Sequence, residues 1–305
     1  AHYNVQQAIN KVEAYQLYNG GFSMWPSGGN DDWWISAYIT HFLIEAKNAG
    51  FETNELKIPS ALKYLQEKVK SRETYTYFYL GPNGTILSKV YPKKEIFYSM
   101  FVLALADKSP TPTMNFYKSQ ASQLAGDSRY LLSAAYQLSG DRKSAQVVLP
   151  RMFPSDRINS MDGDGYASPV RDIAISLLAL LDSDPANGQI ADLVRILGES
   201  ITSQPYYSTQ DNAFTMLAMG KFAKTNANTN VIADVSIDGK TVAHMDKKDV
   251  VVNRNFANKP VVITAKGSGK VFYYYEVSGI PVFPVASDVD NFLKVRRYYY
   301  DRNNK

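Results

Sequence analysis

The 305-residue chain contains no cysteine and only three histidines. The lack of cysteine excludes disulfide bonds and thiol chemistry within the chain, and it leaves the redox compartment undetermined. The histidines are His2 near the N-terminus, His41 and His244. Because nucleophilic triads and zinc sites need histidine or cysteine beside further ligands, this inventory predicts no catalytic residue, no metal site and no cofactor.

Long hydrophobic runs and concentrated charge are also missing. No apolar run reaches the length of a membrane span, so none is expected in this chain. The net charge is +4, but the basic residues are dispersed, and pairs such as Lys93-Lys94 are the largest groups. Nucleic-acid binding needs a concentrated phosphate-facing patch and is therefore not expected. The 45% hydrophobic and 20% charged residues indicate a chain with sizeable cores.

Helical patterns fill the first three quarters of the sequence. Five segments are apolar around most of a helix, which is typical of helices buried on nearly all sides: residues 33–46, 95–106, 129–138, 169–181 and 209–223. Five amphipathic segments alternate with them: residues 4–18, 56–70, 111–124, 142–152 and 189–201. The later buried segments begin roughly 40 residues apart, which indicates stacked helical hairpins. We therefore predict a ring with buried helices inside and amphipathic helices outside.

Strand patterns appear in two places. Residues 75–79 and 85–91 predict a β-hairpin inserted between two helices, projecting from the ring as a partner-contact surface or as exposed decoration. After residue 226, Asp238-Gly239 predicts a tight turn between strands 231–237 and 241–245. Runs 250–252, 261–265 and 271–277 continue an antiparallel sheet. Residues 280–284 are predicted to be a linker, and 292–300 the first strand of a further domain.

Three groups of polar residues are candidates for chemistry. His41 lies on a core helix and is predicted to be a packed or hydrogen-bonded structural residue. Residues 162–165 (Asp-Gly-Asp-Gly) resemble a calcium loop but lack its later Glu, which favours a surface turn.

Carboxylates near the starts of the buried helices form the third group, and they leave an enzymatic alternative open. Asp31 and Asp32, beside the aromatic residues Trp25, Trp33, Trp34 and Tyr38, could act on a glycan with Asp172 or Asp211 as second group. Helix capping by all four carboxylates is the favoured interpretation, because the helix dipole attracts acids there.

The motifs add up to a resemblance to the bacterial alpha-2-macroglobulins. The resemblance covers essentially the whole chain, and two segments carry most of it. The residues that match the thioester-type domain are Gly20, Gly21, Phe22, Trp25, Pro26, Trp33, Ala37, Tyr38 and His41, and then Ser208, Thr209, Gln210 and Asp211 in the last buried helix.

The resemblance implies a mainly α fold with a C-terminal β domain. Residues 1–227 would form an α/α toroid with five of its six hairpins, the first being missing. Residues 228–285 would belong to a CUB-like β domain, a small antiparallel β-sandwich, and residues 286–305 would begin a macroglobulin-like domain.

The same resemblance implies a non-enzymatic protease inhibitor of the cell envelope, periplasmic or associated with the outer membrane. Its partners would be proteases, trapped by the full-length protein, and other domains of the same chain. Members of the family capture proteases through a Cys-Gln thioester, for which this chain has no cysteine. The histidine that assists acyl transfer in complement-type relatives is also absent from residues 90–95. These departures favour noncovalent trapping, and a Cys-x-Glu-Gln thioester upstream of Ala1 is the alternative. The alternatives are a toroidal glycoside hydrolase or polysaccharide lyase, and a structural module of the envelope.

Overall fold

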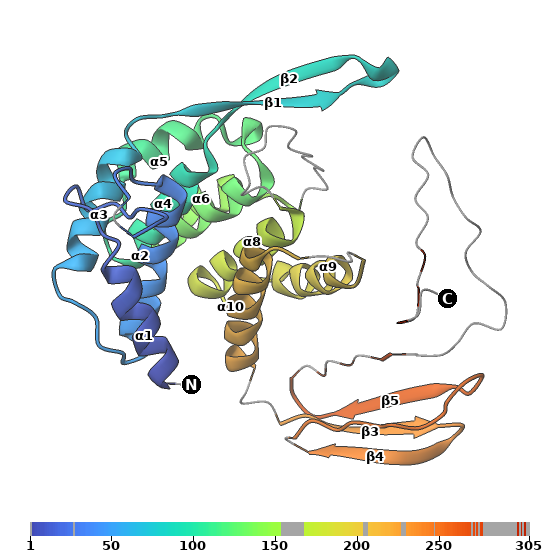
Figure 1. Ribbon diagram of the computed structural model, residues 1–305. Coiled ribbons are helices and arrows are strands. Elements are labelled where there is room, and N and C mark those ends of the chain that lie inside the picture. The colour runs from blue at the N-terminus through green and yellow to red at the C-terminus, as the bar shows by residue number, and fades with distance from the viewer. Residues whose placement is uncertain are drawn as a thin grey trace. The chain divides into compact units, whose positions relative to one another are not determined.

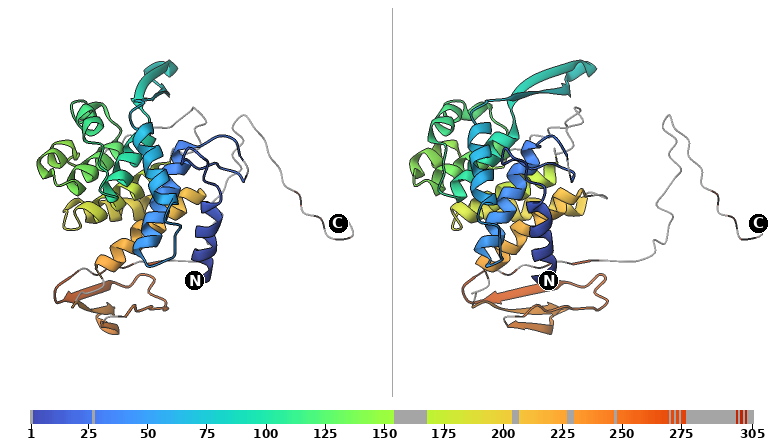
Figure 2. Two further views of the ribbon diagram at one scale, coloured as in Figure 1. Left: turned by 90° about the vertical axis from the view of Figure 1, so that its left-hand side faces the viewer. Right: turned by 60° about the vertical axis from the view of Figure 1, so that its left-hand side comes forward.

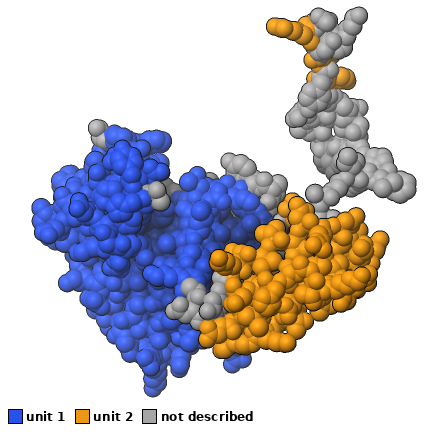
Figure 3. Space-filling view, turned by 90° about the horizontal axis from the view of Figure 1, so that it is seen from below, with its two compact units in different colours: residues 1–228 blue, residues 229–305 orange. Residues whose placement is uncertain are grey.

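The computed structural model describes residues 2–26, 28–153, 168–203, 207–226, 230–246 and 248–269, with isolated positions 271, 273, 275, 276, 298, 300 and 302. The chain divides into two compact units, Ala1–Asn228 and Thr229–Lys305, which Figure 3 colours separately. The first unit is helical apart from one β-hairpin, and the second contains a small antiparallel sheet (Figure 1). The chain is therefore mainly α.

All ten predicted helices are present in the first unit. Their bounds are α1 (His2–Glu13), α2 (Trp33–Asn48), α3 (Lys57–Lys68), α4 (Lys94–Leu105), α5 (Thr111–Lys118), α6 (Gly126–Leu138), α7 (Arg142–Val148), α8 (Pro169–Ser183), α9 (Gln189–Ser203) and α10 (Thr209–Thr225). Two of these helices end earlier than predicted. Helix α1 ends at Glu13 rather than at residue 18, and α7 ends before Pro150, which restricts the backbone of the residue preceding it.

The predicted helix at 111–124 is in fact two shorter elements. Helix α5 ends at Lys118, and the 3-10 helix η2 (Ala121–Gln123) follows. The hydroxyl of Ser119 donates to the carbonyl of Phe116 at 2.7 Å, and such local bonds compete with continuation of a helix.

The buried helices pack against one another in chain order. Helix α2 contacts α4, α4 contacts α6, α6 contacts α8, and α8 contacts α10. In α4 every residue from Ile96 to Ala104 is buried, as its largely apolar sequence predicts. The amphipathic helices lie against these: α3 on α2 and α4, α5 and α7 on α6, and α9 on α8. The predicted alternation of buried and one-faced helices is therefore confirmed from α2 to α9.

The prediction that residues 209–223 form a helix buried on nearly all sides is wrong for α10. Among its residues only Asp211, Phe214, Ala218 and Phe222 are buried, and Met216 is 75% exposed. Helix α8 packs along one side of α10, and within the described ranges no helix covers the face that carries Met216.

The predicted insertion between α3 and α4 is a β-hairpin that extends away from the helices of this unit (Figures 1 and 2). Strand β1 (Thr74–Leu80) pairs antiparallel with β2 (Ile86–Pro92), and the 3-10 turn η1 (Pro82–Gly84) joins them. Tyr75 stacks on Tyr91 with ring centroids 6.0 Å apart. The hairpin prediction is confirmed.

The second unit contains strands β3 (Ile232–Ile237), β4 (Lys240–Asp246) and β5 (Val261–Lys266) in the order β4-β3-β5. Asp238 and Gly239 have φ of +53° and +74°, so they form the predicted two-residue turn of the β3–β4 hairpin. The described residues of the second unit form this one sheet and do not include a second layer of a sandwich.

The strand predicted at 250–252 is wrong. These residues belong to the connection that leads from β4 past β3 to the opposite edge of the sheet, and Val251 is 88% exposed. The predicted linker at 280–284 lies outside the described residues, as does most of the predicted strand at 292–300. Of the predicted strand at 271–277, residues 271, 273, 275 and 276 are described, and none of them belongs to a strand.

Candidate functional site

The glycine-rich loop before α2 closes tightly on the rest of the helical unit. Gly20 has φ of +88°, and a Cβ there would lie 2.3 Å from the carbonyl oxygen of Ser60. A Cβ at Gly21 would lie 2.7 Å from the ring of Tyr64. Both positions therefore require glycine. Helix α1 ends at Glu13, so Gly20 and Gly21 lie in the loop beyond its C-terminal end.

The other loop residues of the motif divide into a buried and an exposed group. Phe22 is fully buried, and its backbone forms isolated β-bridges with Gln16 and Asp32. In contrast, Trp25 is 70% exposed and Pro26 is exposed. Phe22 therefore anchors the loop, while Trp25 is presented on the surface of the unit.

Only part of the capping prediction for the four carboxylates is confirmed. Asp32 is the N-cap of α2 and accepts a hydrogen bond from the amide of Ile35 at 2.8 Å. Asp211 closes a capping box on α10, accepting from the amide of Ser208 at 2.9 Å. Ser208 is exposed, and so is Thr209.

Asp31 and Asp172 are not caps. Asp31 accepts a hydrogen bond from the hydroxyl of Tyr64 and pairs with Lys68 at 3.2 Å. Asp172 lies in the first turn of α8, whose N-cap is Ser168. The capping prediction is wrong for these two residues because each pairs with a lysine from another part of the chain, Lys68 for Asp31 and Lys94 for Asp172. The sequence alone does not reveal such pairs.

The two motif segments meet in the core of the helical unit. The indole nitrogen of Trp34 donates to Oε1 of Gln210 at 3.0 Å, which joins α2 to α10. The rings of Tyr38 and Phe214 lie 5.4 Å apart across the same interface. Trp33 faces the other neighbour of α2, and its indole donates to Ser99 of α4 at 2.9 Å. Ala37 is fully buried on the same helix.

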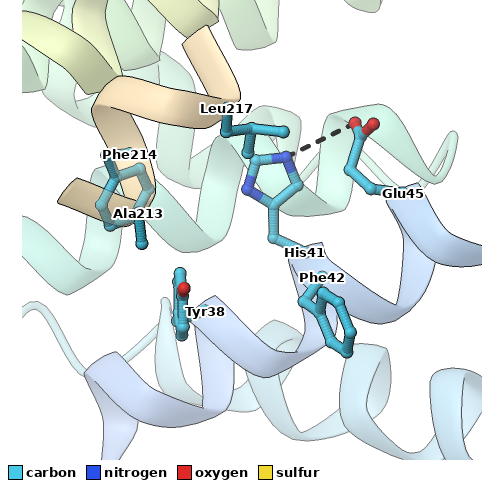
Figure 4. A pocket seen from close by; sticks show the side chains of 7 residues that line it. All are labelled: Tyr38, His41, Phe42, Glu45, Ala213, Phe214 and Leu217. Atoms are coloured by element: carbon cyan, nitrogen blue, oxygen red, sulfur yellow. Dashed lines mark ion pairs between the residues drawn. The ribbon is translucent and has the colours of Figure 1, made fainter. Parts of the chain in front are cut away.

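A pocket of about 190 Å³ lies between α2 and α10 (Figure 4). Its lining residues are Tyr38, His41, Phe42, Glu45, Ala213, Phe214 and Leu217. His41 is 1% exposed, and its Nδ1 lies 2.9 Å from the hydroxyl of Tyr98 on α4. The prediction that His41 is a buried, hydrogen-bonded residue is confirmed.

An ionic cluster adjoins this pocket at the His41 side. Nε2 of His41 lies 3.6 Å from Oε1 of Glu45. The ammonium of Lys221 on α10 lies 2.6 Å from the same Glu45 oxygen and 2.5 Å from Oδ1 of Asp182 on α8. Hereafter His41, Glu45, Asp182 and Lys221 are called the His41 cluster.

The two carboxylates of the His41 cluster have different proton affinities. Burial alone would raise the pKa of Glu45, but His41 and Lys221 outweigh it and lower the pKa to about 2. For Asp182 burial prevails over the opposing effect of Lys221, so its pKa is raised. Single ligand atoms of His41, Glu45 and Asp182 all lie within 4.8 Å of one another, a grouping that could hold a metal ion.

A second ionic cluster joins the N-terminal ends of α4, α6 and α8. The ammonium of Lys94 lies 3.0 Å from Oδ2 of Asp127 and 2.5 Å from Oδ2 of Asp172. Arg171, which is 1% exposed, pairs with Asp172 at 2.8 Å and stacks over Trp34 at 4.5 Å. Hereafter these four charged residues are called the Lys94 cluster.

The Lys94 cluster also separates the pKa values of its two carboxyls. Burial raises the pKa of Asp127. At Asp172 the charges of Lys94 and Arg171 overcome burial and lower the pKa. A pair of this kind can serve acid–base catalysis when it flanks a cleft. Here a buried ammonium lies between the two carboxylates, an arrangement that suits an ion-pair network better than opposed attack on a glycosidic bond.

The remaining sequence candidates do not join either cluster. His2 stacks on Phe51, and exposed His244 pairs with Asp234 at 2.7 Å in the second unit. Residues 162–165 lie outside the described residues. None of the helices in the described ranges has both the length and the apolar character needed to cross a membrane.

Sequence reasoning missed the partners of both clusters. Glu45 follows His41 at the spacing of one helical turn, which was the single available signal. Asp182 and Lys221 come from helices far along the chain, so their approach depends on how α2, α8 and α10 pack.

Comparison with known proteins finds relatives of this chain. No family model matches the chain. An alpha-2-macroglobulin of Xylella fastidiosa strain Temecula1 is 25% identical over 313 residues, covering 97% of this chain and 18% of the relative. The chain thus spans about a fifth of the length of that relative.

Solved structures agree at the level of the fold. Native alpha-2-macroglobulin of Escherichia coli, solved from domain MG7 to the C-terminus, matches 88% of this chain and 38% of its own with a TM-score of 0.60 and 19% identity. The trypsin-activated form of the Escherichia coli protein matches 87% of this chain and 17% of its own with a TM-score of 0.57 and 18% identity. The resemblance to bacterial alpha-2-macroglobulins inferred from the motifs is therefore confirmed along nearly the whole chain.

Proposed function

We propose that this chain is part of an alpha-2-macroglobulin-like protease trap of the bacterial cell envelope and that it contributes a non-catalytic scaffold. The observation that carries the proposal is the similarity to a bacterial alpha-2-macroglobulin over 97% of the chain. The trypsin-activated state of the Escherichia coli protein suggests the kind of partner, namely a protease that cuts the full-length molecule.

Within this proposal the helical unit is an α/α toroid with five of its six hairpins. Contacts between successive buried helices support a ring, and the Trp34–Gln210 bond links the first of these helices to the last. The exposed face of α10 with Met216 supports a further hairpin next to it, because an inner helix of a toroid is covered on both sides. We assign residues 1–227 to this domain, residues 228–285 to a CUB-like β-sandwich and residues 286–305 to a macroglobulin-like domain.

The motif residues act structurally in this view. The loop of Gly20, Gly21 and Phe22 and the Trp34–Gln210 bond hold α2 in place beside α10. Trapping by this chain is noncovalent unless a thioester lies elsewhere in the protein, because the chain has no cysteine. Rearrangement after cleavage would then confine the protease by shape. The expected location is the periplasm or the outer-membrane surface.

The proposal is tested on the full-length protein with trypsin as the probe. A trap leaves trypsin active toward a small chromogenic peptide but protects a large protein substrate, since confinement limits access without blocking the active site. Cleavage should also change the mobility of the protein on a native gel. Methylamine reactivity would reveal a thioester outside this chain.

Two outcomes would overturn the proposal. If trypsin degrades the large substrate at its normal rate and the cleaved protein keeps its mobility, the chain is a structural envelope module instead. Turnover of a polysaccharide by the purified chain, lost in Asp172→Asn, would establish the glycoside hydrolase or lyase alternative.

A further inference from the structure

The His41 cluster lies where three buried helices approach their C-terminal ends. Glu45 is in the last turn of α2, Asp182 is the penultimate residue of α8, and Lys221 lies near the end of α10. Helix C-termini carry partial negative charge and favour a cation. The cluster therefore concentrates negative potential from both side chains and backbone.

Within the described part of the chain, two buried atoms of the cluster have no partner at hydrogen-bond distance: Nε2 of His41, which lies 3.6 Å from Oε1 of Glu45, and Oδ2 of Asp182. Buried polar atoms normally find partners, so two orphans in one cluster call for an explanation. Figure 4 shows the imidazole turned toward Glu45 at the wall of the pocket. With its Nδ1 bonded to Tyr98, His41 can present an unprotonated Nε2 to a ligand on this side.

The cluster holds two carboxyl groups around one ammonium group. Lys221 supplies one positive charge, whereas Glu45 and Asp182 supply two negative charges when both are ionised. A divalent cation in place of the ammonium would balance both carboxylates. It would also give Nε2 of His41 a partner.

We propose that His41, Glu45 and Asp182 form a binding site for a divalent transition-metal ion, with Lys221 as a competing internal cation. One imidazole nitrogen and two carboxylates are a donor set that Zn²⁺ accepts, with solvent from the pocket completing the coordination. Tyr98 acts as the positioning residue: with Nε2 on the metal, Nδ1–H would donate a hydrogen bond to the hydroxyl oxygen of Tyr98 and so orient the imidazole.

Binding requires small movements that the geometry permits. The three ligand atoms lie within 4.8 Å of one another, and zinc bonds of about 2.1 Å require them to draw within about 4 Å. Lys221 must withdraw. Its side chain is 21% exposed, and its flexible stem allows the ammonium to move toward solvent.

Lys221→Met tests the competition directly. This variant removes the internal cation and retains a stem of similar size. We expect isothermal titration with zinc chloride to show one ion per chain, bound at least tenfold more tightly than in the unmodified chain. Introducing Asp182→Asn or Glu45→Gln into this variant should weaken binding at least tenfold, because each replaces a charged ligand by a neutral one of similar shape.

Two further variants separate positioning from nonspecific binding. Tyr98→Phe should weaken zinc binding by about 10- to 100-fold, as loss of such an orienting group does elsewhere. His244→Gln is the matched control, because His244 also pairs with a carboxylate, Asp234, but on the surface of the second unit. It should leave the affinity of the site unchanged. Tryptophan fluorescence checks that each variant is folded.

Cobalt(II) provides a second readout that does not depend on variant affinities. Visible absorption of the Lys221→Met chain loaded with cobalt should show bands of a low-coordinate site with a nitrogen ligand, and His41→Gln should abolish them. The proposal is overturned if neither the unmodified chain nor Lys221→Met binds zinc. It is equally overturned if binding persists in Asp182→Asn and Glu45→Gln, or disappears in His244→Gln.

Discussion

Replacing Lys94 by methionine should destabilise the helical unit more than any other single lysine change among the described ion pairs. Its side chain is 13% exposed, and those of Asp127 and Asp172 are 5% and 18% exposed. Methionine preserves most of the apolar stem, so the variant mainly removes the charge. The two carboxylates would then remain buried, with Arg171 as the nearest compensating cation.

The size of the stability loss in Lys94→Met follows from the ion-pair distances and from the burial of the charged groups. At an effective dielectric constant of about 20, opposite charges 3 Å apart attract by about 5 kcal/mol. Desolvation offsets much of this attraction in the intact cluster. Removal of one partner nevertheless leaves an uncompensated buried charge, which costs about 3–5 kcal/mol. We expect the free energy of unfolding to fall by that amount at pH 7.

Urea unfolding followed by tryptophan fluorescence measures this loss. All three tryptophans lie in the helical unit, so their signal reports that unit and not the sheet. Lys70→Met is the matched control, because Lys70 pairs with Glu67 at 2.8 Å while both side chains are mostly exposed. An exposed pair of this kind is worth less than about 1 kcal/mol.

The pH dependence of stability and the added substitution Asp127→Asn provide two further tests of this prediction. Burial already raises the pKa of Asp127, and loss of Lys94 raises it further, so the variant should regain stability as the pH falls and this carboxyl takes a proton. Asp127→Asn added to Lys94→Met should recover part of the loss. A cost below about 1 kcal/mol, equal to that of Lys70→Met, would refute a stabilising role for the cluster.

Three smaller predictions concern the motif loop and α2. Gly20→Ala should lower the free energy of unfolding in urea more than Gly50→Ala does. Both glycines have positive φ, but only Gly20 lacks room for a Cβ, so equal losses would contradict the close approach to Ser60. Asp32→Ala should cost about 1 kcal/mol through the lost cap, and an unchanged midpoint would exclude capping. The pKa of Glu45 is lowered to about 2, so its stabilisation is present above pH 4.5 and is lost as the pH falls toward 2. Glu45→Gln should remove that part of the acid sensitivity in the presence of a chelator, and an unchanged pH profile would contradict it.

Local patterns predicted the elements of the first unit well. Helices such as α4 and α8 contain largely apolar segments longer than an ordinary strand, and the turn at Asp238-Gly239 has positive φ at both residues. Burial of His41 also followed from its apolar surroundings. These features depend on neighbours within a few residues, and such information is present in the sequence.

The failures concern contacts between distant segments. The burial of α10 was overestimated because its apolar composition does not reveal which faces find a neighbour. Residues 250–252 have a strand-like composition, but β5 already occupies the free edge of β3. For Asp31 and Asp172, the deciding partners are lysines on other helices. Capping rules alone do not identify such partners.

Helix α8 connects the two ionic clusters, since Asp172 lies in its first turn and Asp182 beside its last residue. Ten residues of helix separate the two carboxylates by about 15 Å, beyond the range at which substitutions usually interact. Lys94→Met and Lys221→Met should therefore lower the stability of the helical unit independently, and their combined cost should equal the sum within about 0.5 kcal/mol. If the loss of unfolding free energy in the double variant, measured by urea unfolding, differs from the sum of the two single losses by more than about 1 kcal/mol, α8 transmits displacement from one end to the other. In that case metal binding at the His41 cluster would alter the packing around Lys94, and the two clusters would be energetically coupled.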